Sequence, residues 1–153
     1  AFDQWFNDVA GVNKKTLLPL QLTKSGGNVY TYDNSAFFPI DSTLWGNEGN
    51  PHNFHFTFEL HTKFVYLGGE VFTFTGDDDL WVFINKKLAI DLGGVHGAMN
   101  GQVDLDAKAS ELGIQKGQTY PLDFFFAERH TSESNFRIDT TIASFVDCGP
   151  VVQ

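Results

Sequence analysis

Residues 72–94, FTFTGDDDLWVFINKKLAIDLGG, decide the fold of this chain. Two apolar runs in and beside this stretch, residues 71–75 and 80–84, have the pattern of strands. Between them lie a glycine and three consecutive carboxylates: Gly76, Asp77, Asp78 and Asp79. Like charges this close repel one another, and burial would penalise each ionised form further. The stretch therefore predicts two strands joined by either a solvated acidic turn or an oxygen-only Ca²⁺ site.

The rest of the chain alternates apolar and polar residues over short runs, which is typical of antiparallel strands with one buried face. Asn85, Lys86 and Lys87 predict a tight hairpin turn, since Asn tolerates positive φ. Pro19 restricts the first expected strand to a sheet edge, and residues 30–51 are expected to form an irregular loop. The further strands are expected at residues 16–23, 52–66, 88–92, 102–106, 120–128 and 136–142.

Two short helices are expected beside these strands. Residues 2–9 carry aromatic residues at spacings of three and four, and Asp106 is predicted to cap a helix over residues 107–112 that Gly113 ends. About eight to ten short strands with no strand–helix alternation predict an all-β fold, an antiparallel β-sandwich or barrel with one or two short helices. We expect residues 1–146 to form a single domain and residues 147–153 a C-terminal tail.

The composition excludes several classes of protein. The 153 residues include 16 Phe, and an aromatic content of 15% indicates a packed core rather than disorder. A net charge of −9 argues against nucleic acid and anionic membrane surfaces as partners, because both require clustered Lys and Arg. No apolar run approaches the roughly 20 residues needed for membrane insertion. The single cysteine, Cys148, predicts no internal disulfide.

Several separate segments resemble, in order, the fibro-slime branch of the PA14 superfamily. The main segments are residues 76–85, GDDDLWVFIN, and residues 88–96, LAIDLGGVH. The supporting segments are residues 38–41 (FPID), 52–57 (HNFHFT), 125–131 (FFAERHT) and 134–136 (SNF). The resemblance covers about residues 30 to 142 and implies a PA14-type β-sandwich.

The resemblance also implies a binding chemistry. In the sugar-binding modules of fungal adhesins, two Asp residues joined by a cis peptide bond hold Ca²⁺, an Asn and main-chain carbonyls complete the shell, and the ion ligates sugar hydroxyls. Asp77 and Asp78 match that pair, with Asp78 and Asp79 as the alternative register. Asp79 is expected to bind the metal or to face solvent. Asn135 is the candidate for the loop Asn.

Other polar residues flank the same end of the predicted sheets and are candidates for ligand binding. Arg129 is expected to fork onto a carboxylate such as Asp91, and a structural salt-bridge network is the alternative interpretation. Trp81 and the aromatic residues of the loop at 30–51 are interpreted either as packing or as a surface for sugar stacking. The full set of ligand-binding candidates is Asp91, His96, Glu128, Arg129, His130 and Ser134.

Histidines and carboxylates elsewhere in the sequence predict no further site. His55, Glu59 and His61 share one strand face but match no zinc spacing, so we interpret them as solvent-facing. Asp78 and Glu128 could act as an acid–base pair on a glycoside. The sequence lacks a nucleophile elbow, a P-loop and a dinucleotide fingerprint, so we expect no enzyme.

We expect a calcium-dependent, adhesin-like carbohydrate-binding module of a secreted or cell-surface protein. The partner would be a glycan or polysaccharide. The alternative is a calcium-stabilised interaction, signalling or matrix module with a protein partner and without direct sugar binding.

Overall fold

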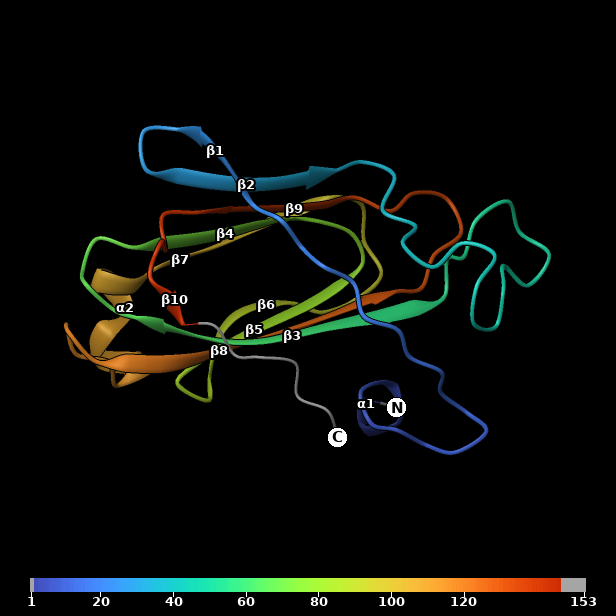
Figure 1. The fold of residues 1–153 in the computed structure, drawn as a ribbon, viewed down its shortest axis with the longest axis horizontal. Helices are drawn as coiled ribbons and strands as arrows, with labels where there is room; N and C mark the ends of the chain where they lie inside the picture. The colour runs from blue at the N-terminus through green and yellow to red at the C-terminus, as the bar shows by residue number, and fades with distance from the viewer. Residues whose placement is uncertain (1, 147–153) are drawn as a thin grey trace.

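The structure, a computed structural model, describes residues 2–146 as two packed antiparallel sheets with two short helices (Figure 1). The predicted all-β sandwich is confirmed, whereas the predicted tail and Cys148 lie outside the described residues. The helices are α1 (Phe2–Trp5) and α2 (Leu105–Leu112). The strands are β1 (Thr23–Gly26), β2 (Val29–Asn34), β3 (Phe56–Val65), β4 (Val71–Gly76), β5 (Asp79–Ile84), β6 (Lys87–Leu92), β7 (Met99–Asp104), β8 (Thr119–Glu128), β9 (Phe136–Thr140) and β10 (Phe145–Val146).

The strand order brings distant parts of the sequence together. Sheet A has the order β1-β2-β9-β4-β7, and sheet B has the order β10-β3-β8-β5-β6. β4 and β5, which flank the acidic turn, therefore lie in different sheets, and the turn crosses from one sheet to the other. The loops β4–β5, β6–β7 and β8–β9 meet at one end of the sandwich, on the right in Figure 1.

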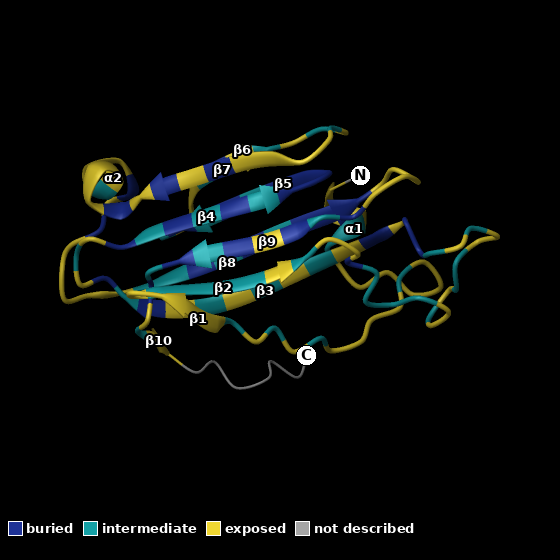
Figure 2. Ribbon diagram, turned by 90° about the horizontal axis from the view of Figure 1, so that it is seen from above, coloured by how far each residue is buried: buried dark blue, intermediate teal, exposed yellow. Residues whose placement is uncertain are grey.

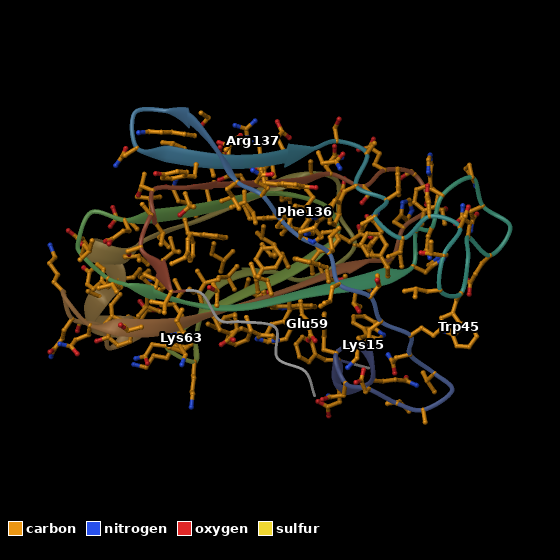
Figure 3. The ribbon with its side chains drawn as sticks, in the orientation of Figure 1. Lys15, Trp45, Glu59, Lys63, Phe136 and Arg137 are labelled. Atoms are coloured by element: carbon orange, nitrogen blue, oxygen red, sulfur yellow. The ribbon has the colours of Figure 1, made fainter. Side chains whose placement is uncertain are left out.

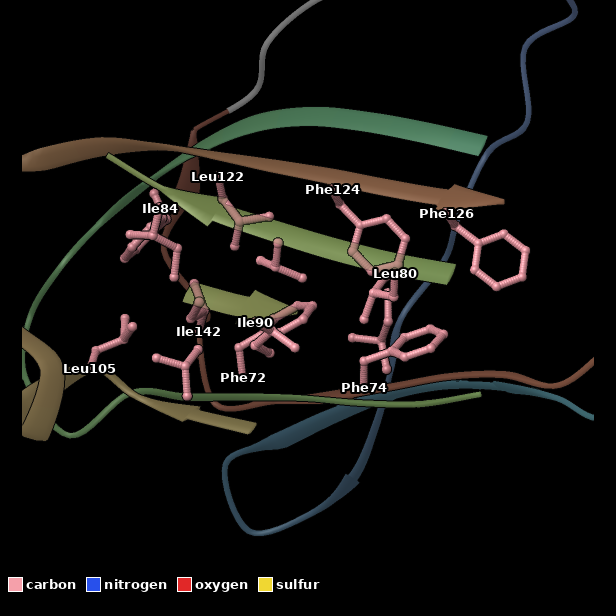
Figure 4. Close-up of a cluster of buried hydrophobic side chains, with 14 of the residues drawn as sticks. Phe72, Phe74, Leu80, Ile84, Ile90, Leu105, Leu122, Phe124, Phe126 and Ile142 are labelled. Carbon is pink, nitrogen blue, oxygen red and sulfur yellow. The ribbon is translucent and has the colours of Figure 1, made fainter. Parts of the chain in front are cut away.

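Large aromatic side chains fill the space between the sheets. Alternation along β4 and β8 points Phe74 toward Phe124, whose ring centroids are 5.6 Å apart (Figure 4). Phe136 points into the same space and stacks on Phe37 at 4.3 Å, whereas Arg137 lies outside (Figure 3). Buried residues alternate with intermediate or exposed residues along β4 and β9 in the same way (Figure 2). Burying one such side chain stabilises the fold by about 1.5–3 kcal/mol.

The first predicted strand is wrong, although its alternation is meaningful. Residues 16–22 form no strand and cross the open edge of the sandwich (Figure 1). Leu18, Leu20 and Leu22 pack against the core, whereas Leu17 is 86% exposed. Pro19 lacks an N–H to donate to a ladder, so the segment covers the core with side chains instead of pairing its backbone. The first strand begins at Thr23.

The region at 30–51 was predicted to be irregular throughout, and this is wrong for its first residues. Residues 29–34 form β2, which pairs with β9 from Tyr30↔Thr140 to Asn34↔Phe136. The remainder is a long loop that contacts the β8–β9 loop, since Phe37 N–H donates to the Ser134 carbonyl at 3.0 Å.

The helix and turn predictions are partly confirmed. Asp104, not Asp106, caps α2 by accepting from Ala107 N–H at 3.0 Å, because the helix begins two residues earlier than predicted. Gly113 ends it in the left-handed region, at φ 68°, as expected. The hairpin turn also has the predicted positive φ, 51° at Asn85 and 62° at Lys86. The N-terminal helix is shorter than predicted and ends at Trp5.

Candidate metal and ligand site

The three carboxylates of the acidic turn are buried at the end of the sandwich where the loops meet. Asp77, Asp78 and Asp79 are 4%, 2% and 2% exposed, so the solvated-turn interpretation and a solvent-facing Asp79 are both wrong. The peptide bond between Asp77 and Asp78 is cis, as the resemblance implies for the calcium pair. A Cβ on Gly76 would lie 2.2 Å from the carbonyl oxygen of Asn135, so the close approach of the two loops requires glycine.

Asp77 joins the acidic turn to the β8–β9 loop through Asn135. The backbone N–H of Asn135 donates to Oδ1 of Asp77 at 2.6 Å, and its amide Nδ2 donates to Oδ2 at 2.7 Å. The Asp77 N–H donates in return to the Asn135 carbonyl at 3.3 Å. Because the amide nitrogen is engaged, the amide oxygen of Asn135 is the atom left for another ligand.

Asp78 lies between the other two loops and receives one backbone donor on each oxygen. His96 N–H donates to Oδ1 at 3.3 Å, and Arg129 N–H donates to Oδ2 at 3.1 Å. A carboxylate oxygen accepts about two hydrogen bonds or metal contacts. Each oxygen of Asp78 therefore keeps capacity for a cation.

Asp79 is bonded on both oxygens by the side chain of Arg129. Arg129 Nε donates to Oδ2 at 2.5 Å, Nη2 donates to Oδ1 at 2.9 Å, and Gly94 N–H adds a bond to Oδ1 at 2.6 Å. Arg129 thus forms the expected two-point contact with a carboxylate, but the partner is Asp79 and not Asp91. Asp79 directly follows the candidate calcium ligands Asp77 and Asp78. Hydrogen bonding to Asp79 raises the pKa of Arg129, so the guanidinium stays charged.

Glu128 contributes a buried carboxyl to the same end of the core. It ends β8 in the inward-facing register of Phe124 and Phe126 and is 2% exposed. Its Oε1 accepts from His130 N–H at 3.3 Å, whereas Oε2 is buried and has no hydrogen-bond partner among residues 2–146. Burial, reinforced by the negative charges of Asp78 and Asp77, raises the pKa of Glu128 to about 8.

Ser134 and His96 hold the surrounding loops. The Ser134 hydroxyl donates to the Phe37 carbonyl at 2.8 Å, which fixes the loop after β2 to the β8–β9 loop. The ring nitrogens of His96 lie 2.9 Å from the Leu92 carbonyl and 2.8 Å from the Gly97 carbonyl. Burial lowers the pKa of His96, but these carbonyls and the charges of Asp78 and Asp79 outweigh it and raise the pKa.

Asp91 and His130 are exposed and make local contacts. Asp91 Oδ1 accepts from Gly93 N–H at 3.0 Å, and His130 Nδ1 lies 2.9 Å from the Ser132 hydroxyl. Within the described part of the chain, neither is hydrogen-bonded to the acidic turn.

Aromatic residues from the N-terminal segment complete this end of the molecule, and the sequence reasoning missed them. The Trp5 ring lies 5.3 Å from the guanidinium carbon of Arg129. Trp81 faces outward from β5 and meets Phe2 edge-on at 5.3 Å, so it belongs neither to the core nor to a free platform. The spacing of residues 2–9 predicts a helix with one aromatic face but carries no signal for the surface that this face contacts.

The donor set of the turn fits a hard cation. Carboxylate and amide oxygens without thiolates are the ligands that Ca²⁺ prefers. Over residues 2–146, no three His, Cys, Asp or Glu side chains form a group that could hold a metal by themselves. Asp77 and Asp78 would therefore need the Asn135 amide oxygen and main-chain carbonyls, which is the combination that the resemblance implies.

The comparisons with known proteins agree with the resemblance. The family model of the PA14 domain matches residues 23–149. Protein psiQ of Dictyostelium discoideum is 43% identical over 97% of this chain and 16% of its own length. Protein psiR of the same organism is 44% identical over 97% and 16%, and protein psiD is 45% identical over 97% and 31%. This chain thus spans less than a third of these relatives.

No solved structure matches the chain significantly. Among residues 2–146, no helix has the length and apolar character to cross a membrane.

Proposed function

Because this chain belongs to the PA14 domain family, which is a family of binding-type domains, we propose that it is a carbohydrate-binding module whose acidic turn holds Ca²⁺. The observation that carries the proposal is the buried pair Asp77 and Asp78. Their oxygens are only partly used, and they lie where three loops meet. Buried negative charge without enough cationic partners favours a bound cation.

The neighbouring residues suit this role. Asp77 and Asp78 would hold the ion, and Asn135 would turn its amide oxygen to it while its amide nitrogen keeps Asp77 oriented. When bound, Ca²⁺ supplies positions at which neighbouring hydroxyls of a sugar replace water. Gly94 and His96 are tied by their N–H groups to Asp79 and Asp78, so the β6–β7 loop is held beside the ion as part of a binding surface.

We further propose that the domain acts outside the cell, as part of a secreted or surface protein, and binds without catalysis. In this proposal, Asp78 contributes to the cation site and Glu128 holds the β8–β9 loop through the N–H of His130, so neither acts in acid–base catalysis.

A second candidate function is a protein-interaction module in which Ca²⁺ only stabilises the loops. One observation favours it: Asp77, Asp78 and Asp79 each accept hydrogen bonds from a neighbouring loop. Glycan binding distinguishes the two candidates.

The test is glycan-array binding with Ca²⁺ and with chelator, for the natural chain and for Asp78→Asn. The matched control is Asp33→Asn, which removes a carboxylate that is 54% exposed on the far face of sheet A. We expect a glycan signal that chelator and Asp78→Asn remove and Asp33→Asn preserves. A glycan signal that survives chelator would refute the calcium mechanism. Ca²⁺ binding without any glycan signal would favour the interaction module.

A further inference from the structure

The acidic turn divides its three carboxylates between two kinds of partner. Among the described residues, Asp77 and Asp78 accept only from neutral N–H donors, which are the backbone and amide of Asn135 and the backbones of His96 and Arg129. Asp79 alone is bonded by a charged side chain, on both oxygens. The guanidinium of Arg129 therefore pairs with Asp79, the residue next to the proposed calcium ligands Asp77 and Asp78.

The geometry of Arg129 suits a fixed internal counter-ion. Its Nε and Nη2 form the two-point fork that matches a carboxylate and that a lysine ammonium cannot reproduce. Asp79 pairs with Ala127 in the β5–β8 ladder, and Arg129 directly follows the last residue of β8, so the fork joins the start of β5 to the start of the β8–β9 loop. The Trp5 ring lies 5.3 Å from the guanidinium carbon on another side. Without the buried carboxyl of Glu128, the three turn carboxylates and one guanidinium carry a formal charge of −3 + 1 = −2.

From this arrangement we propose that Arg129 is a positioning residue that sets the cation preference of the site, by holding Asp79 out of the metal shell so that a charge of −2 faces the ion. This inference rests on the proposed cation site. A site of charge −2 matches a divalent ion. If Asp79 lost its partner, the site would have a charge of −3 and would favour a trivalent ion.

The expected effects follow from Coulomb's law. Replacing Arg129 by a neutral residue removes one positive charge near the ion, and the gain in binding free energy grows in proportion to the charge of the ion. If Ca²⁺ binding strengthens about tenfold in Arg129→Gln, Tb³⁺ binding should strengthen about thirtyfold. The ratio of Tb³⁺ to Ca²⁺ affinity should therefore rise.

The experiment measures Ca²⁺ and Tb³⁺ affinities by calorimetry and by Tb³⁺ luminescence in competition with Ca²⁺. The variants are Arg129→Gln, Arg129→Lys, Asp79→Asn and the double variant Asp79→Asn/Arg129→Gln. Arg129→Lys keeps the positive charge but loses the two-point fork to Asp79, so its ratio of Tb³⁺ to Ca²⁺ affinity should fall between those of the natural chain and Arg129→Gln. Asp79→Asn leaves the guanidinium unpaired and should weaken both ions. The double variant restores −2 and should return the ratio to that of the natural chain.

Circular dichroism in chelator checks the fold of each variant. If Arg129→Gln does not fold, Asp79→Asn and Arg129→Lys still test the proposal, because their predicted changes in affinity differ.

A purely structural Arg129 would give a different pattern. Arg129→Gln would then weaken the binding of both ions, and the double variant would bind them no more tightly than either single variant. Either result overturns the inference while leaving the cation site in place. If the natural chain binds neither ion, the proposed cation site and this inference both fail. If it binds Ca²⁺ but no glycan, only the carbohydrate part of the proposed function fails.

Discussion

Replacing Asp78 by Asn tests the cation site most directly, because the two side chains have nearly the same shape. Asp78 is 2% exposed and accepts from His96 N–H and Arg129 N–H. In Asp78→Asn, one of these donors would face the new NH₂ group, and losing a hydrogen bond to a charged acceptor costs about 1.5–3 kcal/mol. Reduced repulsion from Asp77 and Asp79 offsets part of that cost. We therefore expect only moderate destabilisation in chelator.

The natural chain and Asp78→Asn should differ in how much Ca²⁺ raises the Tm. An ion present at a hundred times its Kd stabilises the natural chain by about 2.7 kcal/mol. A domain of this size gains about 2–4 °C in Tm for each kcal/mol, which gives a rise of about 5–11 °C. Asp78→Asn should show almost none of this rise. A bound cation needs the charge of Asp78, and the neutral amide does not supply it.

The assay is thermal unfolding with excess Ca²⁺ and with chelator. Asp33→Asn again serves as control and should keep the full rise. A full calcium-dependent rise in Asp78→Asn would show that the ion binds elsewhere, and would refute the reasoning from the acidic turn.

Three further predictions concern stability. Gly76→Ala should lower the free energy of unfolding by about 2 kcal/mol or more, because its Cβ would lie 2.2 Å from the carbonyl oxygen of Asn135. Urea unfolding measures this loss, and an unchanged unfolding midpoint would contradict the prediction. The pKa of Glu128 is about 8 in the fold, against 4.5 for an ordinary Glu carboxyl. The folded chain therefore binds more protons than the unfolded chain between these two pH values. In chelator, the free energy of unfolding should fall as the pH rises from 4.5 to 8. Glu128→Gln should flatten this pH dependence in urea titrations, and an unaltered slope would assign it to other groups. Phe74→Ala should cost about 3–5 kcal/mol by removing a fully buried ring; a loss below about 1 kcal/mol would mean that the core collapses around the cavity.

Much of the sandwich could be predicted because strand patterns are local. Alternation at period two identifies the buried face without knowledge of the partner strand. Phe72 and Phe74, which alternate with Val71, Thr73 and Thr75 in the predicted strand at residues 71–75, both lie in the core. The Asn85–Lys86 turn and the end of α2 at Gly113 were also predictable, since both depend on backbone conformations that few residue types adopt. The same alternation misassigned residues 16–22, because packing of every second leucine against a core does not require a backbone ladder.

The acidic turn shows most clearly which features the sequence determines and which depend on the tertiary structure. Three adjacent carboxylates between two strands were visible in the sequence, and so was the chemistry of an oxygen-only site. Only the tertiary structure decided that Asp79 pairs with Arg129, that Asp77 faces Asn135, and that Glu128 is buried beside them. These contacts join loops about 50 residues apart. Their geometry depends on which strands become neighbours and on the paths of the loops, and no local pattern encodes either.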